Sequence, residues 1–150
     1  MMNRKLCVLV VGVALGACRP VVKAPVHDTF TKVGQADAQV APLRYGSVSK
    51  VVKTRGDYGW FQFAGRAGDD VDVAVRSGNG DAVAFLLDAN DDVVASNDDV
   101  DGGSSDARLA ATLGADGTYY IAFREYTYAP AAFMVELNGS RVTSTEVNAK

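Results

Sequence analysis

Apolar and polar side chains alternate along most of the chain after residue 45. In the segment 70–76, for example, Val71, Val73 and Val75 are separated by polar or small residues. A period of two among β-branched residues is typical of a half-buried β-strand. The same signal recurs in seven other segments. The predicted strands are residues 47–53, 58–64, 70–76, 82–88, 93–96, 107–113, 118–124 and 131–137.

Turn-forming residues separate these segments, roughly every 8 to 12 residues. The clearest turn is Asp116-Gly117, which lies between two alternating segments and is a strong hairpin signal. No convincing helical period interrupts the strands. The pattern therefore predicts an all-β fold, a jelly-roll-like antiparallel β-sandwich of about eight strands.

Aromatic side chains on the predicted outer faces form a first candidate surface. Trp60 has the opposite parity to Phe61 and Phe63, so we predict that it is exposed. Tyr126 and Tyr128 lie in the loop that follows the strand 118–124. Two interpretations remain open, namely a sugar- or polymer-binding surface and ordinary cross-strand pairing with loop anchoring.

The first 17 residues have the composition of a targeting segment. A basic start precedes an apolar stretch at residues 6–14 that is too short to span a bilayer. The stretch ends in Leu15-Gly16-Ala17-Cys18. This tetrapeptide resembles the lipobox of bacterial lipoproteins, which implies cleavage after Ala17 and acylation of Cys18 by fatty acids such as palmitate.

The cysteine count agrees with lipidation. Cys7 lies in the apolar stretch, so Cys18 would be the only cysteine of the mature chain. A single thiol in an exported protein cannot form an internal disulfide and needs an explanation. Arg19, rather than aspartate, follows Cys18, and the resemblance then implies the outer membrane. We expect a lipid-anchored protein of the bacterial outer membrane, facing either the periplasm or the surface.

The sequence divides into four parts. A proline-containing stretch separates the cysteine from the first predicted strand and has no sustained periodicity, as a flexible tether would. The residues after the last strand are polar and are predicted to be disordered. The parts are residues 1–17 as signal peptide, 18–42 as lipidated cysteine and tether, 43–138 as β-sandwich, and 139–150 as tail.

The charge balance narrows the range of partners. The whole chain has a formal net charge of −3, and the signal peptide would remove Arg4 and Lys5 from it. Phosphate binding needs clustered lysine and arginine, so a nucleic-acid partner is not expected. Contact with the membrane is expected through the acyl chains rather than through a basic patch.

Several stretches between residues 45 and 137 occur in a specific order. Residues 81–99 read Asp-Ala-Val-Ala-Phe-Leu-Leu-Asp-Ala-Asn-Asp-Asp-Val-Val-Ala-Ser-Asn-Asp-Asp, and the stretches 57–63 and 67–71 precede them. Ser-Asp-Ala-Arg-Leu at 105–109 and Leu-Gly-Ala-Asp-Gly-Thr-Tyr-Tyr-Ile at 113–121 follow. Together they resemble the bacterial pre-peptidase C-terminal domain.

The resemblance implies a jelly-roll β-sandwich that usually follows exported enzymes as a non-catalytic appendage. Some members bind calcium or insoluble polymers such as collagen. This chain has no peptidase domain, so we expect its partner to be a separate molecule, either an envelope protein or a polysaccharide.

An acidic loop is the main chemical feature. Residues 88–106 hold seven aspartates and no lysine or arginine. Crowded carboxylates repel one another unless water, salt or a cation intervenes. Residues 97–102 space oxygen side chains before a glycine, as a calcium loop does, although the twelfth position is Arg108 and excludes an EF-hand. The resemblance places Asp81 near the same end of the sandwich.

Calcium is therefore a candidate cofactor, and the alternative is a solvated acidic loop that hinders edge-to-edge pairing. The candidate metal ligands are Asp98, Asp99, Asp101 and Asp106, with Asp81 as an additional candidate.

No catalytic constellation is evident. His27 is the only histidine and lies in the tether, so neither a Ser-His-Asp triad nor a Cys-His pair has a base. The aspartates lie in turns, which makes two-carboxylate hydrolysis a less economical interpretation. We expect a non-enzymatic binding or scaffolding module of the envelope. The alternative is an inert structural lipoprotein, or a subunit that packs against a separate exported enzyme, with no metal.

Overall fold

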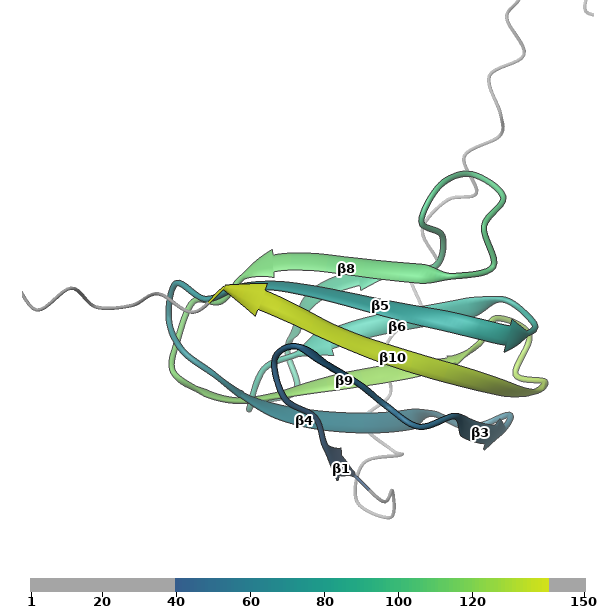
Figure 1. Cartoon of the computed structure of the whole chain (residues 1–150), viewed down its shortest axis with the longest axis horizontal. Helices are drawn as coiled ribbons and strands as arrows, with labels where there is room; N and C mark the ends of the chain where they lie inside the picture. The colour runs from purple at the N-terminus through teal and green to yellow at the C-terminus, as the bar shows by residue number, and fades with distance from the viewer. Residues whose placement is uncertain (1–39, 141–150) are drawn as a thin grey trace, which may run out of the picture.

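The computed structural model describes residues 40–140, which form ten β-strands and no helix (Figure 1). None of these residues therefore belongs to a helix long and apolar enough to span a membrane. The strands are β1 Ala41–Pro42, β2 Ser47–Val48, β3 Val52–Arg55, β4 Gly59–Gly65, β5 Asp70–Asn79, β6 Ala82–Leu87, β7 Val93–Asn97, β8 Ala107–Thr112, β9 Gly117–Glu125 and β10 Pro130–Ser140.

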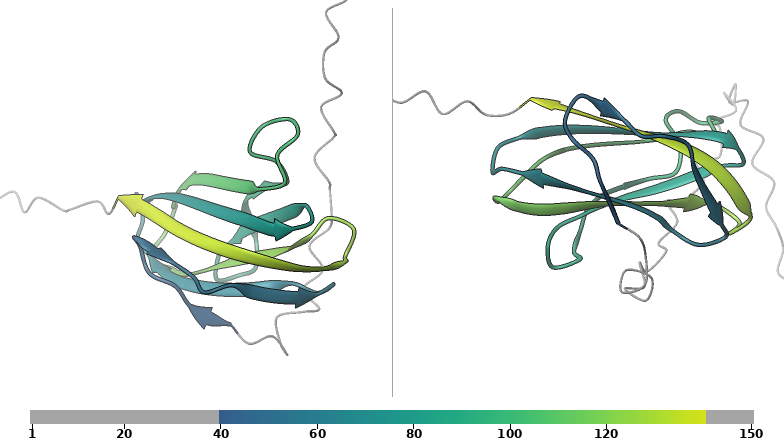
Figure 2. Two further views of the ribbon diagram at one scale, coloured as in Figure 1. Left: turned by 45° about the vertical axis from the view of Figure 1, so that its right-hand side comes forward. Right: turned by 60° about the horizontal axis from the view of Figure 1, so that its bottom comes forward.

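The strands form two sheets stacked face to face (Figure 2). Sheet A has the order β1-β4-β9-β6-β7, and sheet B has the order β2-β10-β5-β8, with β3 also paired to β10. All pairs are antiparallel except β1 with β4, which is parallel. The predicted all-β sandwich is confirmed. The predicted strand 47–53 is divided into β2 and β3, and β1 is an additional strand.

The core lies between the sheets and contains the side chains that the alternating pattern selects. Val73 and Val75 of β5 and Ile121 of β9 have no exposed surface. The Phe123 ring stacks on Phe61 within sheet A at a centroid distance of 5.8 Å. The same ring meets Phe133 of sheet B edge to face at 5.5 Å, so one aromatic side chain joins both layers.

The outer face of sheet A departs from the expectation. Trp60 does face away from the core, as its parity indicates, but only 4% of its surface is exposed. The prediction that Trp60 is exposed was therefore wrong. Every residue of β6 is buried, on both faces of the strand. Burial on both faces is unusual in an antiparallel sandwich, whose outer faces normally contact solvent.

The sandwich extends slightly beyond its predicted ends. Ala41 and Pro42, assigned to the tether, pair with β4, and the Leu43 N–H donates to the Gln62 carbonyl at 2.8 Å. Ser140, assigned to the tail, pairs with Asp70 in β5. The predicted signal peptide, most of the tether and residues 141–150 lie outside the described residues.

Candidate functional site

Part of the acidic segment 88–106 forms strand β7, and only residues 98–106 form the loop that crosses between the two sheets. From here on, the acidic loop means residues 98–106, which lead from β7, at the edge of sheet A, to β8, at the edge of sheet B. The loop is closed by its own backbone, because the Val100 N–H donates to the Asp106 carbonyl at 3.0 Å and the Ser104 N–H donates to the Asp101 carbonyl at 2.9 Å. The Ser105 carbonyl accepts the Ala82 N–H at 2.9 Å, which ties the loop to β6.

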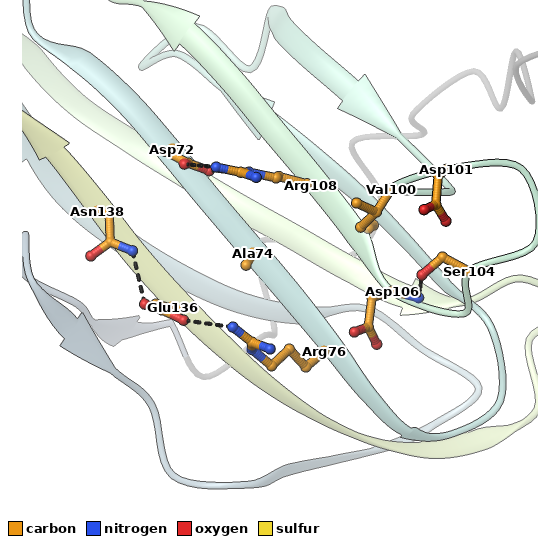
Figure 3. Close-up of a pocket in the computed structure, with 11 residues that line it drawn as sticks. Asp72, Ala74, Arg76, Val100, Asp101, Ser104, Asp106, Arg108, Glu136 and Asn138 are labelled. Atoms are coloured by element: carbon orange, nitrogen blue, oxygen red, sulfur yellow. Dashed lines mark hydrogen bonds and ion pairs between the residues drawn. The ribbon is translucent and has the colours of Figure 1, made fainter.

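Two of the candidate metal ligands lie together beside a groove, and their side chains differ in role. Asp101 and Asp106 both line the groove (Figure 3). The Asp106 Oδ1 atom accepts the backbone N–H of Ser77 at 2.8 Å, so this carboxylate fixes the loop to the end of β5. Asp101 is exposed, and its contact within the loop is made by its carbonyl.

The other three candidates lie outside the groove lining. The Asp99 N–H donates to the Asn97 side chain at 2.6 Å, which forms a tight turn. Asp98 is half-buried, and its Oδ2 atom is buried without a hydrogen-bond partner in the described part of the chain. Asp81 lies between β5 and β6, where its carbonyl accepts the Tyr126 N–H at 2.7 Å.

These positions bear on the calcium prediction without deciding it. Within residues 40–140, no three acidic, histidine or cysteine side chains are grouped closely enough to hold a metal ion. Calcium takes six to eight oxygen ligands, which include backbone carbonyls and water as well as carboxylates. A site at this loop would therefore depend on such oxygens, and calcium binding stays a prediction.

The groove lies on the outer face of sheet B and has a volume of about 410 Å³. Its floor carries two ion pairs that cross from strand to strand (Figure 3). Arg108 of β8 binds Asp72 of β5 through two hydrogen bonds, of which the one from Nε to Oδ1 is 2.8 Å. Arg76 of β5 binds Glu136 of β10 at 3.2 Å. The acidic loop, with Val100 and Asp101, closes one end.

Both carboxylates of the groove floor are held in the ionised form. The hydrogen bond and the charge of Arg108 lower the pKa of Asp72 below its ordinary value, despite partial burial. The hydrogen bond from Asn138, together with Arg76, lowers the pKa of Glu136. Neither carboxylate thus has the raised pKa that a general acid for glycoside hydrolysis requires.

A second polar constellation, which the sequence did not reveal, lies at the end of β9. Glu125 is 6% exposed, and its carboxylate accepts the Thr127 N–H at 2.6 Å, the Thr127 hydroxyl at 2.7 Å and the Ala129 N–H at 3.0 Å. Burial of the Glu125 carboxylate raises its pKa, but these hydrogen bonds, with one from the Asp81 backbone, outweigh burial and lower it. One carboxylate therefore fixes the loop 126–129.

Arg124 precedes this glutamate and is 1% exposed. Its guanidinium donates to the carbonyls of Glu125 and Tyr126, both at 2.9 Å. The Tyr128 ring covers the guanidinium at 4.0 Å, and the Tyr58 ring lies 5.7 Å from it. The only sequence signal for this arrangement is a pair of charges at the end of an apolar strand, which by itself predicts a solvated strand end.

A comparison of the sequence with models of known protein families gives a match that agrees with this β-sandwich. Residues 57–124 match the model of the bacterial pre-peptidase C-terminal domain. Over these residues the resemblance inferred from the sequence is confirmed. No curated protein matches the chain significantly.

Solved structures with a similar fold include two periplasmic inhibitors of g-type lysozyme called PliG. The protein from Aeromonas hydrophila has a TM-score of 0.53 at 14% identity, over 69% of this chain and 97% of that chain. The protein from Salmonella Typhimurium has a TM-score of 0.50 at 18% identity, over 69% and 100%. The pre-peptidase C-terminal domain of a Bacillus anthracis collagenase has a TM-score of 0.49 at 13% identity, over 67% and 96%. At these identities, the similarity between this chain and the two inhibitors shows a common fold and nothing more.

The hydrogen bonds to Glu125 lead to a pH-dependent prediction. Replacing Glu125 by Gln should lower the free energy of unfolding by about 1–2 kcal/mol at neutral pH, because charge-assisted hydrogen bonds to a buried carboxylate are lost. The folded-state pKa is below the ordinary value of 4.5, so this contribution is present above pH 4.5 and is lost as the pH falls through the folded pKa. Denaturant titrations from neutral to acidic pH should therefore show the two proteins converging in acid.

Glu136→Gln serves as the control, because Glu136 lies in the groove on the protein surface, where the hydrogen bonds to it compete with water. It should change the stability less than Glu125→Gln. Equal effects of both substitutions, or a Glu125→Gln effect that persists in strong acid, would contradict the role assigned to the Glu125 carboxylate.

Proposed function

We propose that this protein is a non-catalytic module of the bacterial envelope that binds another macromolecule through the groove on sheet B. The proposal rests on two features that occur together. Paired charges hold fixed positions on the groove floor, and the acidic loop, which its own backbone hydrogen bonds close, lies at one end of the groove. Protein-binding surfaces commonly unite an apolar contact with charges whose positions are set before binding.

The groove has both elements. Its charges are held by pairing, since Asp72 and Arg108 share two hydrogen bonds and Arg76 contacts Glu136. Val100, on the loop, is 48% exposed and supplies the apolar contact. The loop loses little conformational freedom on binding, because internal hydrogen bonds already close it.

The comparisons support a protein as the partner. The PliG proteins, which share the fold, are inhibitors of g-type lysozyme and therefore act on another protein. Pairing of the two floor carboxylates, Asp72 and Glu136, with arginine also favours binding over hydrolysis. A polysaccharide ligand remains the second possibility for the same groove, and an inert structural role, or packing against a separate exported enzyme, is the alternative that the experiment below tests.

A photo-crosslinking amino acid in place of Val100 should form an adduct with a partner in living host cells, because this side chain lies at the rim of the groove. The control is the same amino acid in place of Ala115, which is exposed in the turn between β8 and β9. A discrete adduct at position 100 and none at position 115 is expected. The same products at both positions, or no product at either, would favour the inert role.

The proposal also includes attachment to the outer membrane through lipid on Cys18, which lies outside the described residues. The lipobox resemblance of Leu15-Gly16-Ala17-Cys18 supports it. Two acyl chains attached to this one cysteine would hold the protein stably at the membrane.

Replacing Cys18 by Ser should abolish incorporation of labelled palmitate and release the protein from the outer-membrane fraction. Replacing Cys7 by Ser is the matched control, because Cys7 lies within the predicted signal peptide and should leave labelling unchanged. Labelling that survives Cys18→Ser would show that the anchor is elsewhere or that the segment is an ordinary secretory signal.

Calcium binding at the acidic loop is a second candidate function, and one observation favours it. The buried Oδ2 atom of Asp98 has no hydrogen-bond partner among the described residues. A buried carboxylate oxygen that is left without a partner costs free energy, and a bound cation would remove that cost. Asp98, with backbone carbonyls and water, would hold the ion and so reduce repulsion within the loop.

Calcium at 100 times its dissociation constant should then stabilise the protein by about 2.7 kcal/mol, measured as a rise in melting temperature relative to chelator. Asp98→Asn should abolish this rise. Asp116→Asn, the same change in the hairpin between β8 and β9, should preserve it. No calcium effect on the unsubstituted protein, or an effect that survives Asp98→Asn, would contradict this site.

A further inference from the structure

Basic and acidic side chains are segregated at opposite edges of this molecule. Residues 40–56 hold four lysines and arginines and no acidic residue, whereas residues 88–106 hold seven aspartates and no lysine or arginine. The first stretch forms β1, β2 and β3, and the second forms β7 with the turns on either side of it. Strands β2 and β7 end their sheets, and β3 adjoins β4 while β7 adjoins β8. The two stretches therefore lie on opposite sides of the sandwich, where Figure 1 shows β3 and the loop after β7.

The basic stretch exposes both apolar and charged side chains. Val48 and Val51 are each 58% exposed, more than any other large apolar side chain of residues 40–140. Lys50 and Lys53 are exposed as well, and neither forms an ion pair within this part of the chain. We call these four residues the basic edge.

Strand β7 exposes the same combination with the opposite charge. Val93 is 49% exposed and Val94 is 39% exposed. Asp92 directly precedes the strand and is exposed, and Asp99 follows soon after its end. Neither carboxylate forms an ion pair with a residue that the structure describes. Among the described strands, β7 pairs only with β6, so its other side is open. We call Asp92, Val93, Val94 and Asp99 the acidic edge.

Charges of one sign protect such an edge only from its own kind. Exposed valines at the edge of a sheet favour association with another molecule, and edge charges normally prevent it. Two basic edges repel each other, as do two acidic edges, so a symmetric contact through either edge is disfavoured. A basic edge and an acidic edge attract, and their contact also buries the valines of both. This charge complementarity selects a second copy of the chain as the occupant, because one molecule carries both surfaces.

We propose that the basic edge of one copy binds the acidic edge of a second copy, so that the molecules associate head to tail. Lys50 and Lys53 face the carboxylates at the two ends of β7, and the exposed valines lie between the two copies. The two surfaces differ, so each pair of molecules keeps one free edge of each kind, and the contact can extend to a chain of molecules. No residue of either edge lines the groove on sheet B, so this inference does not rest on the proposed binding function.

Crosslinking between two distinguishable copies tests the contact. Two copies of the full chain, each with a different affinity tag, are produced together in the host. A photo-crosslinking amino acid in place of Val51 of the first copy should capture the second copy. Mass spectrometry should place the link in the tryptic peptide 77–108, between residues 92 and 99. The same amino acid in place of Ala115, which is exposed in the turn between β8 and β9, should capture no second copy.

Charge reversal separates a lost contact from a folding defect. Asp92→Lys with Asp99→Lys in the second copy places like charges on the two edges and should lower the adduct yield by about tenfold or more. Lys50→Glu with Lys53→Glu in the first copy alone should have the same effect. Combining both pairs of substitutions restores opposite charges and should restore the adduct, which a misfolded chain could not do.

Four results would overturn the proposal. Adducts from position 51 to other proteins only would assign the basic edge to a separate partner. A link between the basic edges of two copies would show a symmetric dimer. An adduct that survives both charge reversals made singly would place the contact elsewhere, and the absence of any adduct would leave the chain without this self-contact. The experiment on the groove scores an adduct with another protein, whereas this one scores an adduct between copies, so the two failures are distinguishable.

Discussion

Burial of sheet A on both faces is the constraint on which the rest of the structure depends. In β6, Leu86 points into the core and Phe85 and Leu87 point away from it, and none of the three is more than 2% exposed. The inward side packs on sheet B, and the outward side packs on neighbouring side chains that include Val40, Tyr58, Tyr120 and Tyr126. Sheet B, in contrast, has one face toward the core and its other face toward solvent. Asp72 and Arg108 can occupy that face as an ion pair because nothing apolar has to be buried there.

Two adjacent residues connect these apolar layers to the polar loops. Arg124 lies on the outward side of β9 opposite Val83, and the Tyr128 ring covers it. Glu125 binds the backbone of the loop that holds this tyrosine and also the backbone of Asp81, just before β6. Burying these charges is acceptable only because hydrogen bonds satisfy them. The end of β9, the loop and the start of β6 therefore form one unit.

The fold could be predicted from the sequence because a period of two identifies inward-facing residues without knowledge of strand order. The same rule gave the direction of Trp60 correctly and its exposure wrongly, since parity says nothing about what covers a face. The contact between Asp72 and Arg108 depends on the register of β5 with β8, which pairs Asp72 with Ala110. Register is a tertiary property that alternation alone leaves open. Glu125 was missed for the same reason, because its partners follow it in a loop without periodicity.

The acidic loop shows why a count of aspartates is a weak guide to metal binding. Asp88 accepts the backbone N–H groups of Asn90 and Asp92 at 2.8 and 2.9 Å, and Asp106 accepts that of Ser77. Aspartates favour turns because their side chains accept such bonds, so turn formation accounts for part of the acidic composition. A carboxylate already bonded to the backbone is a poorer candidate for a cation than one that is not. By this argument, Asp98 is the aspartate whose substitution distinguishes a metal-binding loop from a simple acidic turn. Its buried Oδ2 atom accepts no hydrogen bond that closes the loop.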